Sequence, residues 1–238
     1  IYAQAGQSVI AIDADPAASL AYALGLPDEL AAQLSPIAEM DDLIYERTGA
    51  KPGTGGGFFT INPRVDDIPD RFSVSYRGVK LLQLGTISTG GSGCICPESA
   101  ILKSLVTHAI LYRNEVMILD MDAGLEHLGR ATAGAVDAFL IVVEPGRRSL
   151  STAQAIRKLA ADIGVKNCFV VANKVRHQAD RDFIRRTLPA ELPVIGYLPL
   201  SPRAVEADMQ GQAIFDAAPE LVAGAKEIVA AFSRAQDK

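Results

Sequence analysis

Three carboxylates stand directly after short apolar runs of the sequence. Asp13 and Asp15 follow Val9–Ile12, and Asp120 follows Val116–Leu119. Residues two apart in an extended segment share a face, so Asp13 and Asp15 can together orient waters, one of them a nucleophile, at a metal–phosphate centre. A carboxylate in the position of Asp120 is suited to hold Mg²⁺ beside bound phosphates. The alternative is structural, because an Asp at the end of a strand, Asp15 included, can simply cap the next helix.

Two further groups fit a nucleotide site. Gly124 lies four residues after Asp120, where its backbone N–H can approach a phosphate closely. Asn173 ends the apolar run Cys168–Ala172, and its amide has the donors and the acceptor that match the edge of an adenine. A turn-forming Asn is the alternative interpretation.

A cysteine pair, Cys94 and Cys96, indicates a metal site. In an extended segment the two thiols share one face, with Cα atoms about 6.5–7 Å apart. Two thiolates can hold one soft ion, but a closed site needs four ligands, so twofold symmetry would complete it with a second subunit. The third cysteine, Cys168, is predicted to be an inert core thiol. Unmetallated thiols or a disulfide near the upper limit of its span are the alternatives.

The elements that must position these residues alternate along the chain. We predict strands at Val9–Ile12, Phe58–Ile61, Lys80–Leu84, Val116–Leu119, Ala138–Val143, Cys168–Ala172 and Val194–Tyr197. We predict helices at Ala17–Leu24, Pro36–Thr48, Glu98–Tyr112, Leu128–Ala135, Ser151–Ile163, Ala179–Leu188 and Pro219–Arg234. This rhythm indicates an α/β fold, a mostly parallel central sheet with helices on both faces, in a single domain over residues 1–238. Ligands of such sheets bind at the carboxyl ends of the strands, where the polar residues fall.

Composition narrows the class of protein. Of 238 residues, 49% are hydrophobic and 21% are charged, which excludes a disordered chain. The net charge of −5 argues against a nucleic-acid partner, and no apolar run approaches the roughly 20 residues that span a bilayer, so we expect neither nucleic acid nor membrane. Three cysteines suit a reducing cytoplasm, and we expect a cytoplasmic protein.

The motifs VIAIDADP, VMILDMDAG, VVANK and IGYLPLS, in that order, resemble the deviant Walker A P-loop ATPases. This group includes the MinD and ParA partition ATPases and the nitrogenase iron protein. The segments CICPE and LDMDAGLEHLGR are similar to the CooC-type maturation factors of carbon monoxide dehydrogenase. The resemblance covers essentially the whole chain and implies a P-loop NTPase-like fold, with ATP or ADP and Mg²⁺ as cofactors.

The resemblance also assigns roles to residues. It implies that Asp15 places the hydrolytic water with Asp13 beside it, that Asp120 is the Walker B carboxylate, and that Gly124 belongs to the second switch. It makes Asn173 the adenine reader and lets Leu198, Pro199 and Leu200 line the base. Cys94 and Cys96 would bind Ni²⁺ or Zn²⁺ at a dimer interface. Glu126 and His127 fall in the second switch without an assigned role.

The implied function is that of an ATP-hydrolysing metallochaperone, a homodimer that inserts nickel into carbon monoxide dehydrogenase. The alternative is a nucleotide-switched partition or positioning ATPase like MinD or ParA, and a third reading is a relative that binds metal without hydrolysis. The resemblance places the first strand and the phosphate loop of the family before Ile1, and for the chain as printed we predict little ATP hydrolysis.

Overall fold

The chain forms two compact units. The computed structural model describes residues 1–53, 58–85, 96–112, 115–122 and 136–236. Unit 1 comprises residues 1–21 and 26–135, and unit 2 comprises residues 22–25 and 136–238. Each unit has its own sheet. The single domain over residues 1–238 stays a prediction.

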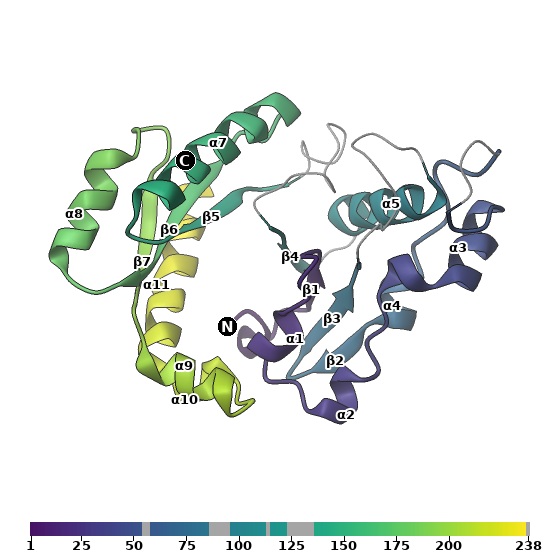
Figure 1. The fold of residues 1–238 in the computed structure, drawn as a ribbon, viewed down its shortest axis with the longest axis horizontal. Coiled ribbons are helices and arrows are strands. Elements are labelled where there is room, and N and C mark those ends of the chain that lie inside the picture. Colours follow the sequence, from purple (N-terminus) through teal and green to yellow (C-terminus); the bar gives the residue numbers. More distant parts are fainter. Residues whose placement is uncertain (54–57, 86–95, 113–114, 123–135, 237–238) are drawn as a thin grey trace. The chain divides into compact units, whose positions relative to one another are not determined.

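Unit 1 is built on a four-stranded sheet in the order β2-β3-β1-β4 (Figure 1). Its strands are β1 (Val9–Asp13), β2 (Val74–Tyr76), β3 (Val79–Gln83) and β4 (Val116–Asp120). Strand β1 is buried at all five positions and pairs in parallel with β3 and β4. Its run of Val, Ile and Ala is typical of a parallel strand that is covered on both faces. Strand β2 is antiparallel to β3. Asp13, the last residue of the central strand, is thereby carried to the carboxyl edge of the sheet.

The helices of unit 1 are mostly short. They are η1 (Ala3–Ala5), α1 (Leu20–Ala23, shared with unit 2), α2 (Asp28–Ala31), η2 (Ile37–Glu39), α3 (Asp41–Thr48), α4 (Ile68–Phe72) and α5 (Pro97–Tyr112). Helix α3 packs on α5, and α4 packs on β3. The core between them contains fully buried Ile44, Ile68, Ile101 and Leu105.

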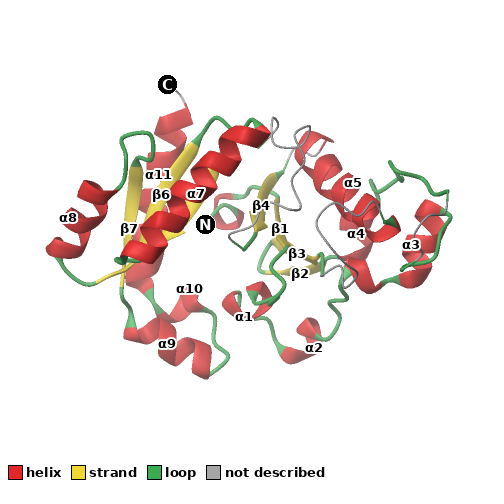
Figure 2. Ribbon diagram, turned by 45° about the horizontal axis from the view of Figure 1, so that its top comes forward, coloured by secondary structure: helices red, strands yellow, loops and turns green. Residues whose placement is uncertain are grey.

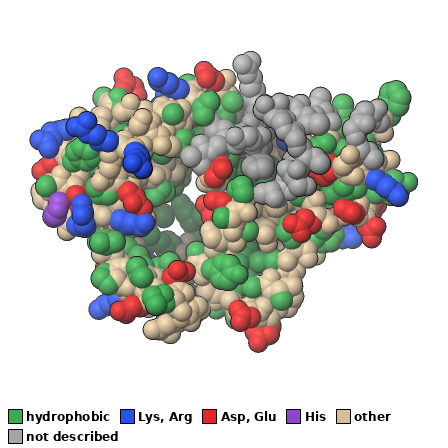
Figure 3. All heavy atoms as spheres, viewed as in Figure 1, with side chains coloured by type: hydrophobic (Ala, Val, Ile, Leu, Met, Phe, Trp, Pro, Cys, Tyr) green, Lys and Arg blue, Asp and Glu red, His purple; other side chains and the backbone are tan. Residues whose placement is uncertain are grey.

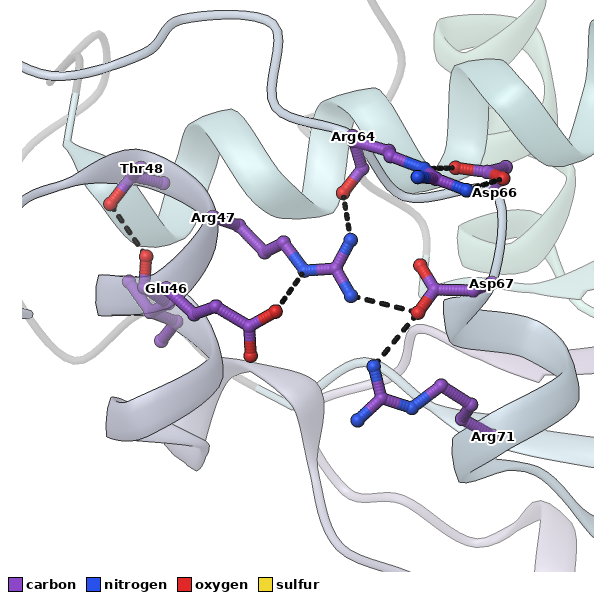
Figure 4. Close-up of polar contacts among 8 residues, drawn as sticks. Glu46, Arg47, Thr48, Arg64, Asp66, Asp67 and Arg71 are labelled. Carbon is purple, nitrogen blue, oxygen red and sulfur yellow. Dashed lines mark hydrogen bonds and ion pairs between the residues drawn. The ribbon is translucent and has the colours of Figure 1, made fainter.

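An arginine–aspartate network ties α3 to the segment that leads into α4 (Figure 4). Arg47 donates to the backbone oxygen of Arg64 at 3.1 Å and to Asp67 Oδ2 at 2.8 Å. Arg71 reaches the same Asp67 oxygen at 2.8 Å. Hydrogen bonds from Arg47 and then from Arg71 hold the pKa of Asp67 far below its usual range. The network therefore joins two segments some twenty residues apart through one ionised carboxylate.

Unit 2 is a three-layer α/β unit around a parallel sheet in the order β5-β6-β7. Its elements are β5 (Phe139–Val143), α7 (Arg147–Ile163), β6 (Cys168–Val175), α8 (Gln178–Thr187), β7 (Val194–Pro199), α9 (Pro202–Met209), α10 (Ile214–Ala217) and α11 (Pro219–Gln236). Helix α7 lies across one face of the sheet and α11 across the other (Figure 2).

Helix α11 approaches β7 closely because two glycines leave room. A Cβ at Gly196 would lie 2.2 Å from Ile228 Cγ1, and a Cβ at Gly224 would lie 2.8 Å from Leu198 Cδ2. A side chain at Gly196 would require α11 or β7 to move, whereas one at Gly224 would require the Leu198 side chain to turn aside. Since α11 covers β7, side chains of β5 on the same face stay open, and Leu140 and Val142 are 46% and 60% exposed.

The α/β class with a mostly parallel sheet and flanking helices is confirmed, as two sheets with one in each unit. Six of the seven predicted strands are present. The strand predicted at Phe58–Ile61 is wrong, because these residues pair with no strand of the described residues, and Phe58 and Ile61 are largely exposed. The helix predicted at Leu128–Ala135 lies outside the described residues.

Other differences come from local turn chemistry. Strand β2 was not predicted; it joins β3 through a two-residue turn at Arg77 and Gly78 with φ of 51° and 79°. The helices α2, α4, α9 and α10 were not predicted either. The helix predicted at Ala17–Leu24 begins only at Leu20, because Ala18 has a φ of +44°. No helix in the part of the chain that the structure describes is long and apolar enough to cross a bilayer.

Candidate functional site

The carboxylates of unit 1 meet at the carboxyl edge of its sheet. Asp13 ends β1 and Asp120 ends β4, and the two residues are register partners on adjacent parallel strands. The backbone N–H of Ala14 donates to the Asp120 backbone oxygen at 2.8 Å, which extends the pairing past the end of β1. Parallel pairing with this register is the reason that two residues more than a hundred positions apart lie side by side.

Asp13 is buried, and both of its carboxylate oxygens hold the following loop. Oδ1 accepts from the Asp15 N–H at 3.2 Å, and Oδ2 accepts from the Leu20 N–H at 2.9 Å, at the first residue of α1. Asp15 is half-exposed, and its Oδ1 accepts from the Ala17 N–H at 2.7 Å. Its Oδ2 has no partner among the described residues. The predicted pair therefore differs in role: Asp13 positions the loop, and Asp15 has an oxygen free to act on a water.

Asp120 is half-buried and makes no side-chain hydrogen bond or ion pair within the described ranges. Burial, followed by the charges of Asp13 and Asp15, raises the pKa of its carboxyl group. An anion that is desolvated beside two other anions is stabilised by a cation. Asp120 therefore fits the predicted role of holding Mg²⁺.

No group of three or more His, Cys, Asp or Glu side chains in the residues that the structure describes forms a ready metal cage. Magnesium sites in proteins typically use one or two carboxylates, with waters and phosphate oxygens completing the shell. A hollow of about 660 Å³ between residues 61–66 and the face of α5 contains none of the predicted site residues.

Cys96 occupies the N-cap position of α5. Its Sγ accepts from the Ser99 N–H at 3.4 Å, its backbone oxygen accepts from the Ala100 N–H at 3.0 Å, and Pro97 takes the first helical position. The side chain is buried. The thiolate is the form of cysteine that binds metal. Its predicted partner Cys94 lies outside the described residues, as do Gly124, Glu126 and His127.

Sequence analysis missed Glu98, two residues beyond Cys96. Its Oε1 accepts from the Gly53 N–H at 2.6 Å, which ties the loop after α3 to the first turn of α5. Its Oε2 is buried and has no hydrogen-bond partner among the residues that the structure describes. An acidic residue in the first turn of a predicted helix, next to the cysteine pair, was the available signal. Cys168, in contrast, lies within β6, where burial raises the pKa of its thiol, so the predicted inert role fits.

Asn173, which is predicted to bind the adenine, lies in unit 2 at a bulge near the carboxyl end of β6. Ala172 pairs with Tyr197 and Val175 pairs with Pro199, so one extra residue is inserted where Asn173 and Lys174 stand. Lys174 has a φ of +54° and its N–H donates to Asn173 Oδ1 at 2.9 Å. The Asn173 amide nitrogen has no partner among the described residues and remains available as a donor.

The segment Leu198–Leu200 follows at the end of β7. Leu198 packs toward α11, against Gly224, whereas Pro199 and Leu200 are exposed. Ser201 ends the segment, and its Oγ accepts from the Ala204 N–H and donates to Glu220. Of the three predicted base-lining residues, Pro199 and Leu200 are open to a ligand, and Leu198 is engaged in packing.

Comparison with known proteins is decisive for the family. The profile of the CobQ/CobB/MinD/ParA nucleotide-binding domain matches residues 1–214. The chain belongs to this family. The predicted membership among P-loop ATPases of the MinD and ParA type is thereby confirmed, and the protein is a nucleotide-binding ATPase by class.

Two relatives are 44% identical to this chain. One is the carbon monoxide dehydrogenase accessory protein CooC of Rhodospirillum rubrum, matched over 226 residues that cover 95% of this chain and 85% of the relative. The other is an ATP-binding protein of Methanocaldococcus jannaschii, with 90% of this chain and 82% of the relative covered. The predicted similarity to the CooC group is confirmed.

Solved structures show the same fold at low identity. The MinC:MinD cell division complex of Aquifex aeolicus matches with a TM-score of 0.64 at 18% identity, covering 99% of this chain and 86% of that chain. MinD of Pyrococcus horikoshii, solved with Mg-ADP, matches with a TM-score of 0.58 at 14% identity, covering 98% and 85%.

Proposed function

We propose that this protein is an ATP-driven, cytoplasmic metallochaperone that inserts nickel during maturation of carbon monoxide dehydrogenase. The relative from Rhodospirillum rubrum is named for that enzyme. The observation that carries the proposal is the position of Cys96, whose sulfur caps α5 in the unit that also holds the carboxylates of β1 and β4. A nucleotide-dependent change in that unit can therefore act on the thiol.

The nucleotide half of the site uses the residues at the strand ends. Asp120 would hold Mg²⁺, which would supply positive charge to the phosphates of ATP. Asp13 fixes the loop between β1 and α1, and the free oxygen of Asp15 orients the attacking water. Asn173 donates to the adenine with its amide nitrogen, Pro199 and Leu200 line the base with Leu198 behind them, and Gly124 offers its N–H to the γ-phosphate.

The metal half uses two thiols from each of two chains. Cys94 and Cys96 give two soft ligands, and a second copy of the chain supplies the other two, so the protein is a homodimer with Ni²⁺ or Zn²⁺ shared between subunits. Nickel is cargo in this scheme. Binding of ATP closes the dimer and hydrolysis reopens it for delivery.

The metal assignment is tested with a variant that keeps the helix cap. Serine is a good N-cap, so Cys94→Ser/Cys96→Ser retains α5 while it removes the soft ligands. We expect one Ni²⁺ or Zn²⁺ per wild-type dimer and an affinity at least ~100-fold lower in the variant, measured by competition with a chromophoric chelator. Cys168→Ala is the matched control and should bind like wild type. Undiminished metal binding by the serine variant would refute the assignment.

The nucleotide assignment is tested separately on the protein as its gene encodes it. Asp15→Asn should lower the rate of ATP hydrolysis at least ~100-fold while the affinity for Mg-ATP stays within about threefold. Hydrolysis at the wild-type rate would show that another group orients the water. A protein that binds ATP but neither Ni²⁺ nor Zn²⁺ would instead favour the alternative, a partition or positioning ATPase like MinD or ParA.

A further inference from the structure

Two arginines of α8 enclose one tyrosine of β7. The guanidinium carbon of Arg181 lies 4.8 Å from the centre of the Tyr197 ring, and that of Arg185 lies 5.2 Å from it. Arg185 Nε also donates to the Tyr197 hydroxyl at 2.7 Å. The ring and its hydroxyl thus fix the guanidinium groups, so little conformational entropy is left to lose when they bind a ligand. We call Arg181, Arg185 and Tyr197 the α8 basic face.

No carboxylate of the described residues forms an ion pair with this face. The acidic residues of the same helix are engaged elsewhere: buried Asp180 pairs with Arg176 at 3.2 Å, and Asp182 accepts from the Gln178 amide at 2.8 Å. Both arginines are exposed. Two cations held close to one ring repel each other, and an anion bound between them would relieve that repulsion.

The surroundings favour a protein partner over a polyanion. A hollow of about 190 Å³, lined by Arg185 and apolar residues such as Leu188, Leu192 and Pro193, adjoins the face. Arginine and tyrosine beside an apolar hollow are the composition of protein-binding hot spots. A nucleic acid or an anionic membrane needs a broad basic surface, whereas the whole chain has a net charge of −5.

The charge is also distributed unevenly along the sequence. Residues of unit 2 include 14 Lys and Arg against 12 Asp and Glu, whereas unit 1 has 9 against 16. Figure 3 shows Lys and Arg gathered over α8 in the view of Figure 1. The local surface at α8 is therefore basic on a chain that is acidic overall.

From these observations we infer that the α8 basic face is a docking surface for a partner protein that presents carboxylates beside an apolar side chain. The guanidinium groups of Arg181 and Arg185 take the carboxylates, and the adjoining hollow takes the apolar group. This surface lies in unit 2, contains no cysteine, and does not depend on the proposed nucleotide chemistry.

The test uses a fluorescein-labelled peptide of four Glu-Glu-Leu repeats and fluorescence anisotropy with the full chain. We expect salt-dependent binding that is at least about 10-fold weaker in Arg181→Ala/Arg185→Ala. Lys158→Ala/Lys166→Ala removes the same charge from exposed positions of unit 2 and should weaken binding less than about threefold. Tyr197→Phe, which removes the hydroxyl that fixes Arg185, should give an intermediate loss. Circular dichroism should show that all variants stay folded, since every substituted residue is at least partly exposed.

Three results would overturn the inference. They are equal weakening by both double variants, no peptide binding at about 50 mM salt, or tighter binding to a 20-base-pair duplex DNA or to phosphatidylserine vesicles than to the peptide. The last result would assign the face to a nucleic acid or a membrane.

Discussion

Asp13 and Asp120 are register partners at the ends of the adjacent parallel strands β1 and β4. The two carboxylates have different surroundings. Asp13 accepts two backbone N–H groups and is satisfied, whereas Asp120 has no partner in the described part of the chain and is desolvated next to other anions. The Asp13 carboxylate therefore stabilises the folded chain, whereas the Asp120 carboxylate carries an uncompensated charge among the described residues.

Neutralising these two residues should change stability in opposite directions. The pKa of Asp120 is raised, so its contribution to stability falls as pH rises from the unfolded-state pKa through the folded one, and at pH 7 the charged form is unfavourable. In buffer with EDTA, Asp120→Asn should raise the Tm by about 1–4 °C, and Asp13→Asn should lower it because an amide cannot accept both N–H groups.

Differential scanning fluorimetry with and without Mg-ATP checks this prediction. The Mg²⁺-dependent rise in Tm should be absent in Asp120→Asn. A lower Tm for Asp120→Asn in EDTA, or an unchanged response to magnesium, would contradict it.

Asn173 should determine the preference for adenine. Because its amide nitrogen is an available donor at the β6 bulge, Asn173→Ala should weaken ATP binding about 10-fold, the effect of roughly one lost hydrogen bond, and reduce discrimination against GTP. Displacement of a fluorescent nucleotide measures both affinities. Asn167→Ala, just before the start of β6, is the control. If both variants bind ATP like wild type, Asn173 is only a turn residue.

The Asp67 network should make unit 1 sensitive to acid. The pKa of Asp67 is strongly lowered by Arg47 and Arg71, so its stabilisation is present above the unfolded-state pKa near 4 and is lost as pH falls below it. Asp67→Asn should lower the free energy of unfolding by about 1–2 kcal/mol at pH 7, after allowance for solvent screening. Below pH 4 the variant should lose less stability with falling pH than the wild type does. Urea titrations at pH 7 and pH 3 measure this.

Asp66→Asn is the comparison variant for this network, because Asp66 is paired with Arg64 at an exposed position and should contribute little. Equal destabilisation by the two variants would show that the ion pairs of Asp67 contribute no more to stability than the exposed pair of Asp66 does.

Gly196→Ala should loosen the packing of α11 on β7. The added Cβ would lie 2.2 Å from Ile228 Cγ1, and we expect a loss of about 1–3 kcal/mol in the free energy of unfolding. The double variant with Ile228→Ala should lose less free energy of unfolding than the two single variants together. The smaller side chain at position 228 leaves a cavity that accepts the methyl group added at position 196. Gly146→Ala has open space around it and should cost only about 0.5–1 kcal/mol, because Ala is a poorer N-cap of α7 than Gly. Additive effects in the double variant would be evidence that no clash occurs.

Most of the strands, and the placement of candidate site residues at their ends, followed from local patterns. The apolar runs gave six strands and placed Asp13, Asp120 and Asn173 after them, because parallel strands buried on both faces read as continuous Val, Ile and Leu. The false strand at Phe58–Ile61 had the same apolar pattern but no pairing partner, and pairing is not a local property. The missed β2 is short and depends on a left-handed turn at Arg77 that propensity does not favour.

By itself the sequence determined the residue types at the strand ends, the cysteine pair and the family, since these depend on composition, spacing and motif. Only the tertiary structure decided which carboxylate is free and which is used, that Cys96 caps α5 with Glu98 beside it, and that Arg181 and Arg185 share one tyrosine ring. The physical reason is that hydrogen-bond satisfaction, burial and charge proximity depend on register and packing between segments far apart in the chain, which no local pattern encodes.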